Sequence, residues 1–341
     1  MKKILALAIA SAFAAPAFAA TSNVDVYGAL GISIEDTNAS NVGMQVTDRQ
    51  SRIGFKGSED LGGGLKAIWQ IEQAISATAG GQDGVGGATL ANRNSFVGLS
   101  GGFGTVLMGR HDTPYKLATA GKLDAFADTM GDVNAAGNLA TSGEAGRSNA
   151  TQLIHATHDA RPAQAIAYIS PNFSGFTFAG AIVATNLDGN GVNDNQNNSN
   201  MDAVSLSGTY ENGPLYAALA YQEAEDISTA AGTQDSAAWK IGAGYKFGDV
   251  KVGFVYEDVE LVGNDLQDAL YGNVAYSMGA ITLKAQYGEL DVATGADASK
   301  LTLGVDYNLS KRTNVYALYD MNDTDGKSNL DGWAMGVRHS F

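Results

Sequence analysis

Residues 237–247 read AAWKIGAGYKF, and this stretch alternates strictly between two kinds of side chain. Trp239 and Ile241 lie on one face, whereas Lys240 and Lys246 lie on the other with glycines between them. A period of two is the pattern of a β-strand, whose successive side chains point to opposite faces. Because ionised lysines on a buried face would carry a large desolvation cost, we interpret the lysine face as wet. The apolar face is then the one that meets lipid or another subunit.

The same alternation recurs from about Val24 to Phe341, with further clear segments at 65–72, 281–288 and 300–309. One large sheet of this kind must protect its edges, and closure into a barrel removes the edges altogether. The fold class is therefore predicted to be all-β, as a transmembrane antiparallel β-barrel.

The connections between alternating segments give the number of strands. Seven are short and rich in turn residues, at 57–65, 100–104, 171–176, 211–214, 247–249, 277–280 and 309–313. Eight longer polar connections lie between them, so fifteen connections join 16 strands with both chain ends on the rim of the short turns. An even strand number, with short turns on one rim and long loops on the other, is typical of outer-membrane barrels.

Residues 1–20 have the pattern of a secretory signal peptide. Lys2 and Lys3 precede an apolar run, and small residues follow it, so we expect cleavage after Ala19 or Ala20. No linker or change of composition divides the remainder, which predicts one β-barrel domain over 21–341.

The overall composition excludes several classes of function. The formal net charge of −15 disfavours nucleic acid as a partner, because a phosphate backbone needs a basic surface. The chain has no cysteine, so neither disulfides nor thiolate chemistry are available. Its glycine-rich stretches lack the Lys-Ser/Thr of a phosphate-binding loop, and no cofactor is predicted.

One connection is far longer than the others. From about Pro114 to Arg161 no alternation is sustained, although 116–130 is compatible with helix. Loops of this length are usually functional or disordered. In a sixteen-stranded barrel such a loop can fold into the lumen and narrow it.

Several tracts together resemble the Gram-negative general porins, in particular the trimeric porins of beta- and gamma-proteobacteria. They are GSEDLGGGLKA from residue 57, VGLSGGFGTV from 97, YNLSKRT from 307 and the final Phe341. The resemblance implies a homotrimer of sixteen-stranded barrels in the outer membrane, in contact with lipid and lipopolysaccharide, with Phe341 as an assembly signal. It also implies that the third long loop constricts each channel and that the second, about 77–90, contacts a neighbouring subunit.

The same resemblance implies a cluster of wall cations, at Arg52, Arg93 and Arg161. Alternation supports an inward Arg52 and adds Lys56 on the same face, but for Arg93 the neighbouring residues argue for opposite faces. The acids expected to face them from the long loop are Asp124 and Asp128, followed by Asp132 and Asp112. The loop lacks the P-E-F-G tract of enterobacterial relatives, which leaves its path open.

The resulting hypothesis is a water-filled channel for passive passage of ions and small hydrophilic solutes, with a charged constriction. Ion selectivity stays open, because wall arginines favour anions while acidic loops concentrate cations at the mouth. A solute-specific channel is an alternative, although no clear aromatic ladder lines the inward face. An outer-membrane barrel enzyme is a further alternative, with histidines at 111, 155, 158 and 339, but no G-x-S-x-G motif occurs.

A weaker pattern concerns divalent cations. Asn186, Asp188 and Asn190 have the spacing of the first half of a calcium loop, but position twelve is Asn197 instead of glutamate. We interpret the segment as a solvated external loop, and divalent ions that bridge acidic loops to lipid phosphates remain a hypothesis.

Overall fold

The computed structural model describes residues 23–38, 43–78, 90–134, 153–155, 157–184, 202–229, 232–261 and 263–341. The expected signal peptide lies outside these ranges, as do most of the 77–90 connection and the segment Asn186–Asn197.

One antiparallel sheet contains all 17 strands of the described residues. They are β1 Asn23–Thr37, β2 Gln45–Asp48, β3 Arg52–Gly62, β4 Leu65–Ala74, β5 Ser95–Gly101, β6 Gly104–Arg110, β7 Ala165–Ile169, β8 Phe176–Val183, β9 Ala203–Asn212, β10 Leu215–Thr229, β11 Gly232–Phe247, β12 Val250–Leu261, β13 Asn264–Met278, β14 Ile281–Val292, β15 Ala298–Asn308, β16 Thr313–Thr324 and β17 Leu330–Ser340. A single helical turn, α2 Pro114–Leu117, follows the Thr113 N-cap.

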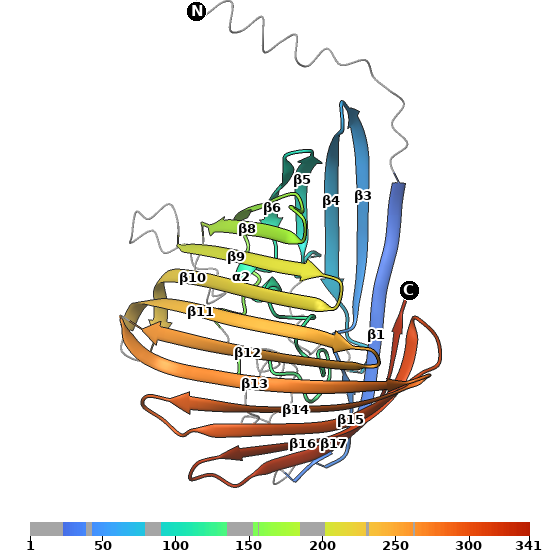
Figure 1. The fold of residues 1–341 in the computed structure, drawn as a ribbon, viewed down its shortest axis with the longest axis vertical. Helices are drawn as coiled ribbons and strands as arrows, with labels where there is room; N and C mark the ends of the chain where they lie inside the picture. Colours follow the sequence, from blue (N-terminus) through green and yellow to red (C-terminus); the bar gives the residue numbers. More distant parts are fainter. Residues whose placement is uncertain are drawn as a thin grey trace, which may run out of the picture.

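The sheet closes into a ring of sixteen barrel strands. β1 pairs with β17 on one side, and on the other side it pairs with both β2 and β3. β2 pairs with the later part of β1 and β3 with the earlier part, so the two are halves of one barrel strand. The predicted strand number is confirmed, and Figure 1 shows the strands wrapped around an interior that holds α2.

The two rims differ in a way that the sequence only partly predicts. All seven short turns are present between consecutive strands, from β3–β4 to β15–β16. On the opposite rim, two connections expected to be long are mostly strand. β10 and β11 pair as far as Thr229 and Gly232, and β12 and β13 as far as Leu261 and Asn264. Polar residues in these hairpins continue the ladder instead of forming open loops.

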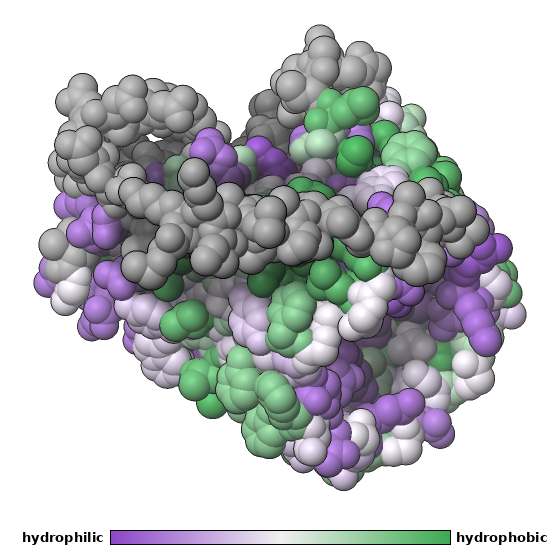
Figure 2. Space-filling view, turned by 90° about the horizontal axis from the view of Figure 1, so that it is seen from above, coloured by the Kyte–Doolittle hydropathy of each residue, from purple (hydrophilic) through white to green (hydrophobic). Residues whose placement is uncertain are grey.

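The two faces of the wall follow the predicted alternation. Trp239 and Ile241 are exposed on the outside, whereas Lys240 and Gly244 between the outward residues are buried inside. Hydrophobic residues, green in Figure 2, lie side by side over the outer surface and are interrupted by hydrophilic ones. No helix among the described residues has the length and apolar character needed to cross a bilayer.

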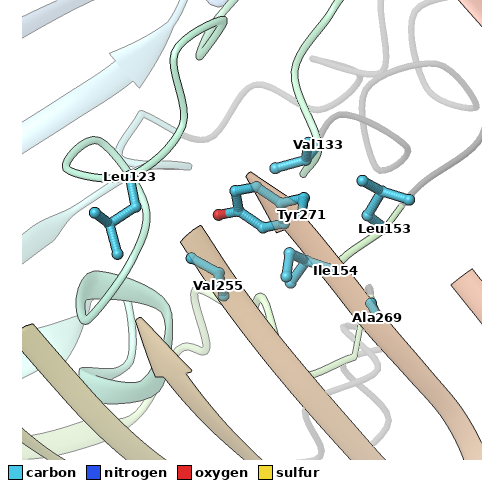
Figure 3. Packing of buried hydrophobic residues seen from close by; sticks show 7 residues of the cluster. All are labelled: Leu123, Val133, Leu153, Ile154, Val255, Ala269 and Tyr271. Atoms are coloured by element: carbon cyan, nitrogen blue, oxygen red, sulfur yellow. The ribbon is translucent and has the colours of Figure 1, made fainter. Parts of the chain in front are cut away.

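The connection between β6 and β7, residues 111–164, is called here the inner loop. Its described parts pack against the inside of the wall in several hydrophobic clusters. In the largest, Leu123, Leu153 and Ile154 of the loop meet Val255 of β12 and Tyr271 of β13 (Figure 3). Burial of a large apolar side chain stabilises by roughly 1.5–3 kcal/mol, so these clusters hold the loop on the wall.

Inward glycines make room for the inner loop. A Cβ added at Gly242 would lie 2.5 Å from the Leu123 side chain, and one added at Gly304 would lie 2.6 Å from the Phe126 ring. In the sequence, small inward residues beside lysines predict a water-filled lumen along this face. The structure corrects this: much of the inner wall is dry beneath the loop, and Lys240 lies 4.1 Å from the centroid of the Tyr115 ring.

Phe341 joins the end of the chain to the first strand. Its backbone N–H donates to the Gly28 carbonyl and its carbonyl accepts from the Gly28 N–H, both at 3.0 Å. A Cβ on Gly28 would lie 2.5 Å from the Phe341 ring and 2.5 Å from the Arg52 carbonyl oxygen. Glycine is therefore required where β1 meets its two neighbours. The role of Phe341 as an assembly signal stays a prediction.

This contact gives a first prediction. Gly28→Ala should destabilise the barrel by about 1–3 kcal/mol, because the added methyl group forces the terminal residue or the β3 backbone to move. The measurement is the thermal unfolding transition of the detergent-solubilised barrel. Gly43→Ala is the matched control, since nothing lies within 4 Å of its added Cβ. Equal transitions for the two variants would show that the junction is loosely packed.

Candidate pore constriction

Arg52 of β3 and Arg338 of β17 converge on one loop carboxylate. Arg52 Nη1 lies 3.2 Å from Asp128 Oδ2, and Arg338 Nη2 forms a short ion pair with the same oxygen. Arg338 also donates to the Ala127 carbonyl at 3.4 Å. Asp128 has a φ of +58°, a left-handed conformation that Asp tolerates better than most residues. The kink turns its carboxylate toward the wall.

Arg93 precedes β5 and pairs with a wall carboxylate. Its Nε lies 2.6 Å from Glu72 Oε1, while Glu72 Oε2 accepts from the Tyr27 hydroxyl at 2.9 Å. Arg93 Nη1 also donates to Gln50 Oε1 at 3.0 Å. Because Arg93 lies before the strand, the alternation of β5 does not determine whether its side chain faces inward or outward. Phe96 faces inward within β5, and this inward ring caused the ambiguity in the sequence.

Arg161, just before β7, pairs with Asp112 at the start of the inner loop. Nη2 lies 3.0 Å from Asp112 Oδ1, and Asn94 bridges the two residues. Lys116 Nζ lies 3.6 Å from Asp112 Oδ1 and 3.0 Å from Asp159 Oδ2. Burial raises the pKa of Asp112, but the cations Arg161 and Lys116 outweigh it and hold that pKa below its usual value. Asp112 therefore stays ionised at neutral pH.

Asp124 and Asp132 lie on the inner loop and accept hydrogen bonds mainly from its own backbone, although Asp124 also accepts from Gln286 of β14 at 3.2 Å. Asp124 accepts from the amides of Phe126 at 2.8 Å and Val133 at 3.3 Å, and Asp132 accepts from those of Asp128 at 2.8 Å and Asn134 at 2.7 Å. Burial raises the pKa of both carboxyls, and for Asp132 the neighbouring Asp124 raises it further. Their geometry fits a role in shaping the turn that presents Asp128.

Two further wall cations complete the site. Lys56 lies on the inward face of β3, with Nζ 5.2 Å from the centroid of the Tyr27 ring. Arg110, at the end of β6, donates to the Arg161 carbonyl at 3.0 Å. Neither forms an ion pair with a carboxylate within the described ranges.

The site therefore holds more cations than paired carboxylates. Among the described residues, five cations pair with four acids, and Arg110 is a sixth cation that donates to a carbonyl. The five are Arg52, Arg93, Arg161, Arg338 and Lys116, and the four acids are Asp112, Asp128, Asp159 and Glu72. Over these described residues the excess is two positive charges, before Lys56 is counted and with the buried Asp124 and Asp132, which bind the loop backbone, left out. The arrangement can attract small anions and repel small cations.

Sequence reasoning missed Glu72 and Arg338. Alternation carried signals for both, because Glu72 shares the inward face of β4 with Lys66 and Gln70, and Arg338 shares that of β17 with Gly336. The signal was overlooked because only loop acids were expected to face the arginines. In the structure one of the facing acids comes from the wall itself.

A pair of largely buried histidines holds the returning arm of the inner loop. His158 Nε2 lies 2.9 Å from Ser236 Oγ, and its Nδ1 accepts from the Gln222 amide at 3.2 Å. The His155 amide donates to Glu257 Oε2 at 2.8 Å. Burial lowers the pKa of His155 to about 4, and burial together with His155 and Lys240 lowers that of His158 to about 3. Both imidazoles are neutral at pH 7.

Acid should therefore release this arm. Free histidines titrate near pH 6.5, so between about pH 6.5 and pH 4 the released arm binds more protons than the docked arm. Docking loses stability as the pH falls through this window, by up to roughly 1.4 kcal/mol per pH unit for each histidine.

A spin label on Thr157→Cys measures the release, because Thr157 lies between the two histidines and the chain has no other cysteine. The label should become more mobile between pH 7.5 and pH 4.5. The same label in a His155→Phe/His158→Phe background should show no such change. Identical mobility at both pH values in the parent chain would contradict the account.

Metal binding finds no support in the described ranges, where no group of three or more His, Asp or Glu is arranged to hold an ion.

Comparisons with known proteins were made on the whole chain. Residues 6–327 match the profile of a family described as Gram-negative porin. Major outer membrane protein P.IB of Neisseria gonorrhoeae is 31% identical over 357 residues, which cover 92% of each chain. Among solved structures, the anion-selective porin from Comamonas acidovorans has a TM-score of 0.74 at 24% identity, covering 94% of this chain and 100% of that one. OmpT of Vibrio cholerae in its trimer form has a TM-score of 0.64 at 17% identity, covering 94% and 99%.

Proposed function

Because the chain belongs to the Gram-negative porin family, we propose that its charged constriction passes small hydrophilic anions in preference to cations. The channel itself follows from the family and the closed barrel: the protein is an outer-membrane general diffusion porin for ions and small hydrophilic solutes. The ion preference and the residues that set it are the proposal.

The observation that carries the proposal is the excess of cations over carboxylates where the inner loop meets the wall. The single carboxylate of Asp128 pairs with two arginines, Arg52 and Arg338. The Arg110 guanidinium donates to a carbonyl instead of a carboxylate. At ~8 Å and an effective dielectric near 20, one uncompensated charge changes the energy of a passing ion by about 2 kcal/mol. That is enough to bias permeation without tight binding, which would block conduction.

Acidic residues elsewhere oppose this effect only weakly. The net charge of −15 concentrates cations near the channel mouth. At physiological salt, exposed charges act over only ~8 Å, so distant acids contribute little at the narrowest point. The charges nearest the ion path should therefore decide the sign of the selectivity.

An enzyme is a less suitable interpretation of the same residues. Ser236 and His158 are in hydrogen-bond contact, but His158 is fully buried and its other nitrogen contacts the Gln222 amide instead of a carboxylate. A nucleophile needs a base oriented by a third group and access to substrate. These features support a channel without catalysis.

A solute-specific channel would need an aromatic track along the lumen. Several inward aromatic side chains instead contact the inner loop. Tyr271 and Tyr316 are buried in the hydrophobic clusters beneath it, and the Tyr216 hydroxyl donates to the Ala118 carbonyl. This arrangement supports a general channel over a solute-specific one.

We also propose that the barrel forms a homotrimer in contact with lipid and lipopolysaccharide. An apolar hollow on the outer wall crosses β1, β2 and β15–β17 and is lined by Ile34, Val46, Val305, Met335 and Val337 among others. Exposed apolar surface of this kind fits a second copy or lipid chains. The OmpT structure in its trimer form supports the first, and the sedimentation mass in detergent tests it.

Removal of the predicted wall cations tests the ion preference. In a salt gradient across a planar bilayer, the wild-type reversal potential should favour anions. Replacing Arg52, Arg93 and Arg161 together by Gln should lower the anion-to-cation permeability ratio by about tenfold or more, since three charges act at close range.

Lys311→Gln/Arg312→Gln is the control, because these cations lie on an exposed turn between β15 and β16. It should leave the ratio nearly unchanged. An unchanged ratio in the triple variant would remove the three arginines from the site.

A further inference from the structure

We propose that Gln50, in a one-residue β-bulge between β2 and β3, is the positioning residue that orients the constriction arginines and thereby sets the ion preference. The inference rests on the proposed function, and names a residue that the sequence did not single out.

The register of the strands defines the bulge. Asp48 pairs with Ile32 of β1, and Arg52 pairs with Ala29. Two residues of β1 therefore oppose three residues of the partner strand, which is one extra residue. Gln50 has a φ of +59°, a left-handed conformation that is uncommon outside glycine. Bulges are over-represented where a strand must re-aim a side chain near a functional site.

Hydrogen bonds around the bulge hold it in place. The Arg49 N–H donates to the Gly31 carbonyl at 2.8 Å, and the Gly31 N–H donates to Ser51 Oγ at 3.0 Å. The Ser51 N–H donates to Asp48 Oδ1 at 3.0 Å. The residues on both sides of Gln50 are thus fixed by hydrogen bonds, so the bulge is an ordered part of the barrel wall.

The bulge changes which residues face inward. Before the bulge, Thr47 and Arg49 are buried inside the barrel and Val46 is exposed outside. After the bulge, Arg52 faces inward and Phe55 is exposed outside. In an uninterrupted strand residues three apart point to opposite faces. Without the extra residue, either Arg49 or Arg52 would point to the lipid face.

Gln50 also binds two arginines of the constriction at once. Its backbone carbonyl accepts from Arg52 Nη1, and its side-chain Oε1 accepts from Arg93 Nη1, each at 3.0 Å. The other attachment of Arg52 is Asp128, and that of Arg93 is Glu72. Each guanidinium is therefore held between one carboxylate and one oxygen of Gln50, and two attachments fix its orientation.

The chemistry of the acceptor matters for an anion-preferring channel. An amide oxygen accepts a hydrogen bond from a guanidinium without neutralising its charge. A glutamate at this position would accept the same bond but would cancel one positive charge of the site. Gln50 thus orients Arg93 without neutralising it, so the positive charge of Arg93 still attracts a passing anion.

The test is the anion-to-cation permeability ratio of Gln50→Gly and Gln50→Glu in planar bilayers. Gln50→Gly keeps the left-handed backbone and the carbonyl that holds Arg52, but it removes the acceptor of Arg93. Its ratio should fall about two- to threefold, the change expected when one charge moves by a few ångström. Gln50→Glu keeps the acceptor but adds a negative charge, so its ratio should fall further.

Gln267→Ala is the matched control. Gln267, on β13, pairs with the buried Val259 of β12 and makes no contact with a constriction arginine within the described residues. Its ratio should equal that of the wild type. The thermal transition of each variant is measured in parallel, because a merely structural role for Gln50 would lower stability without changing the ratio.

If Gln50→Gly keeps the wild-type ratio, the inference is overturned. Should that variant fail to fold, Gln50→Asn supplies the same test, since Asn accepts the left-handed conformation but is one methylene too short to hold Arg93. A wild-type ratio in favour of cations would overturn the proposed function alone, because the effect of Gln50 is still measured as a change from that ratio.

Discussion

Every backbone N–H and C=O inside a bilayer must find its partner within the protein, and this constraint decides the rest of the structure. The chain meets it with a closed ladder in which β1 pairs with β17 on one side and with β2 and β3 on the other. Closure gives a wall with only two faces, and the alternation of the sequence assigns each side chain to one of them. The same requirement explains the close junction at Gly28 and Phe341, where the last residue completes the pairing of the first strand.

The inner face has two functions that the sequence alone does not separate. Part of it is a docking surface, where glycines such as Gly242 and Gly304 receive Leu123 and Phe126 of the inner loop. The other part carries the arginines, which stay near the water-filled path and bind carboxylates from both the loop and the wall. Asp128 reaches this cluster because the loop is docked beside it. Packing and electrostatics are thus linked, since the apolar clusters place the charges.

Much of the fold could be predicted because alternation is a local signal. It gave the strand number, the inward direction of Arg52 and the outward direction of Trp239 without any knowledge of contacts. The docking of the loop could not be predicted, because a glycine that receives a side chain is identical in sequence to one that borders water. Arg93 was ambiguous because it lies outside a strand, where alternation has no meaning. The bulge at Gln50 escaped notice because one extra residue shifts the pattern without breaking it.

The central claim is that the part of the inner wall not covered by the loop, which carries the constriction cations, faces water while the apolar outer wall faces lipid or another subunit. Neighbouring residues of β3 test it directly, because the chain contains no cysteine of its own. Lys56→Cys and Phe55→Cys are each treated with a charged, membrane-impermeant thiol reagent during single-channel recording. The account predicts a stepwise change of conductance for Lys56→Cys and none for Phe55→Cys. Modification of Phe55→Cys with Lys56→Cys left unreacted would contradict it.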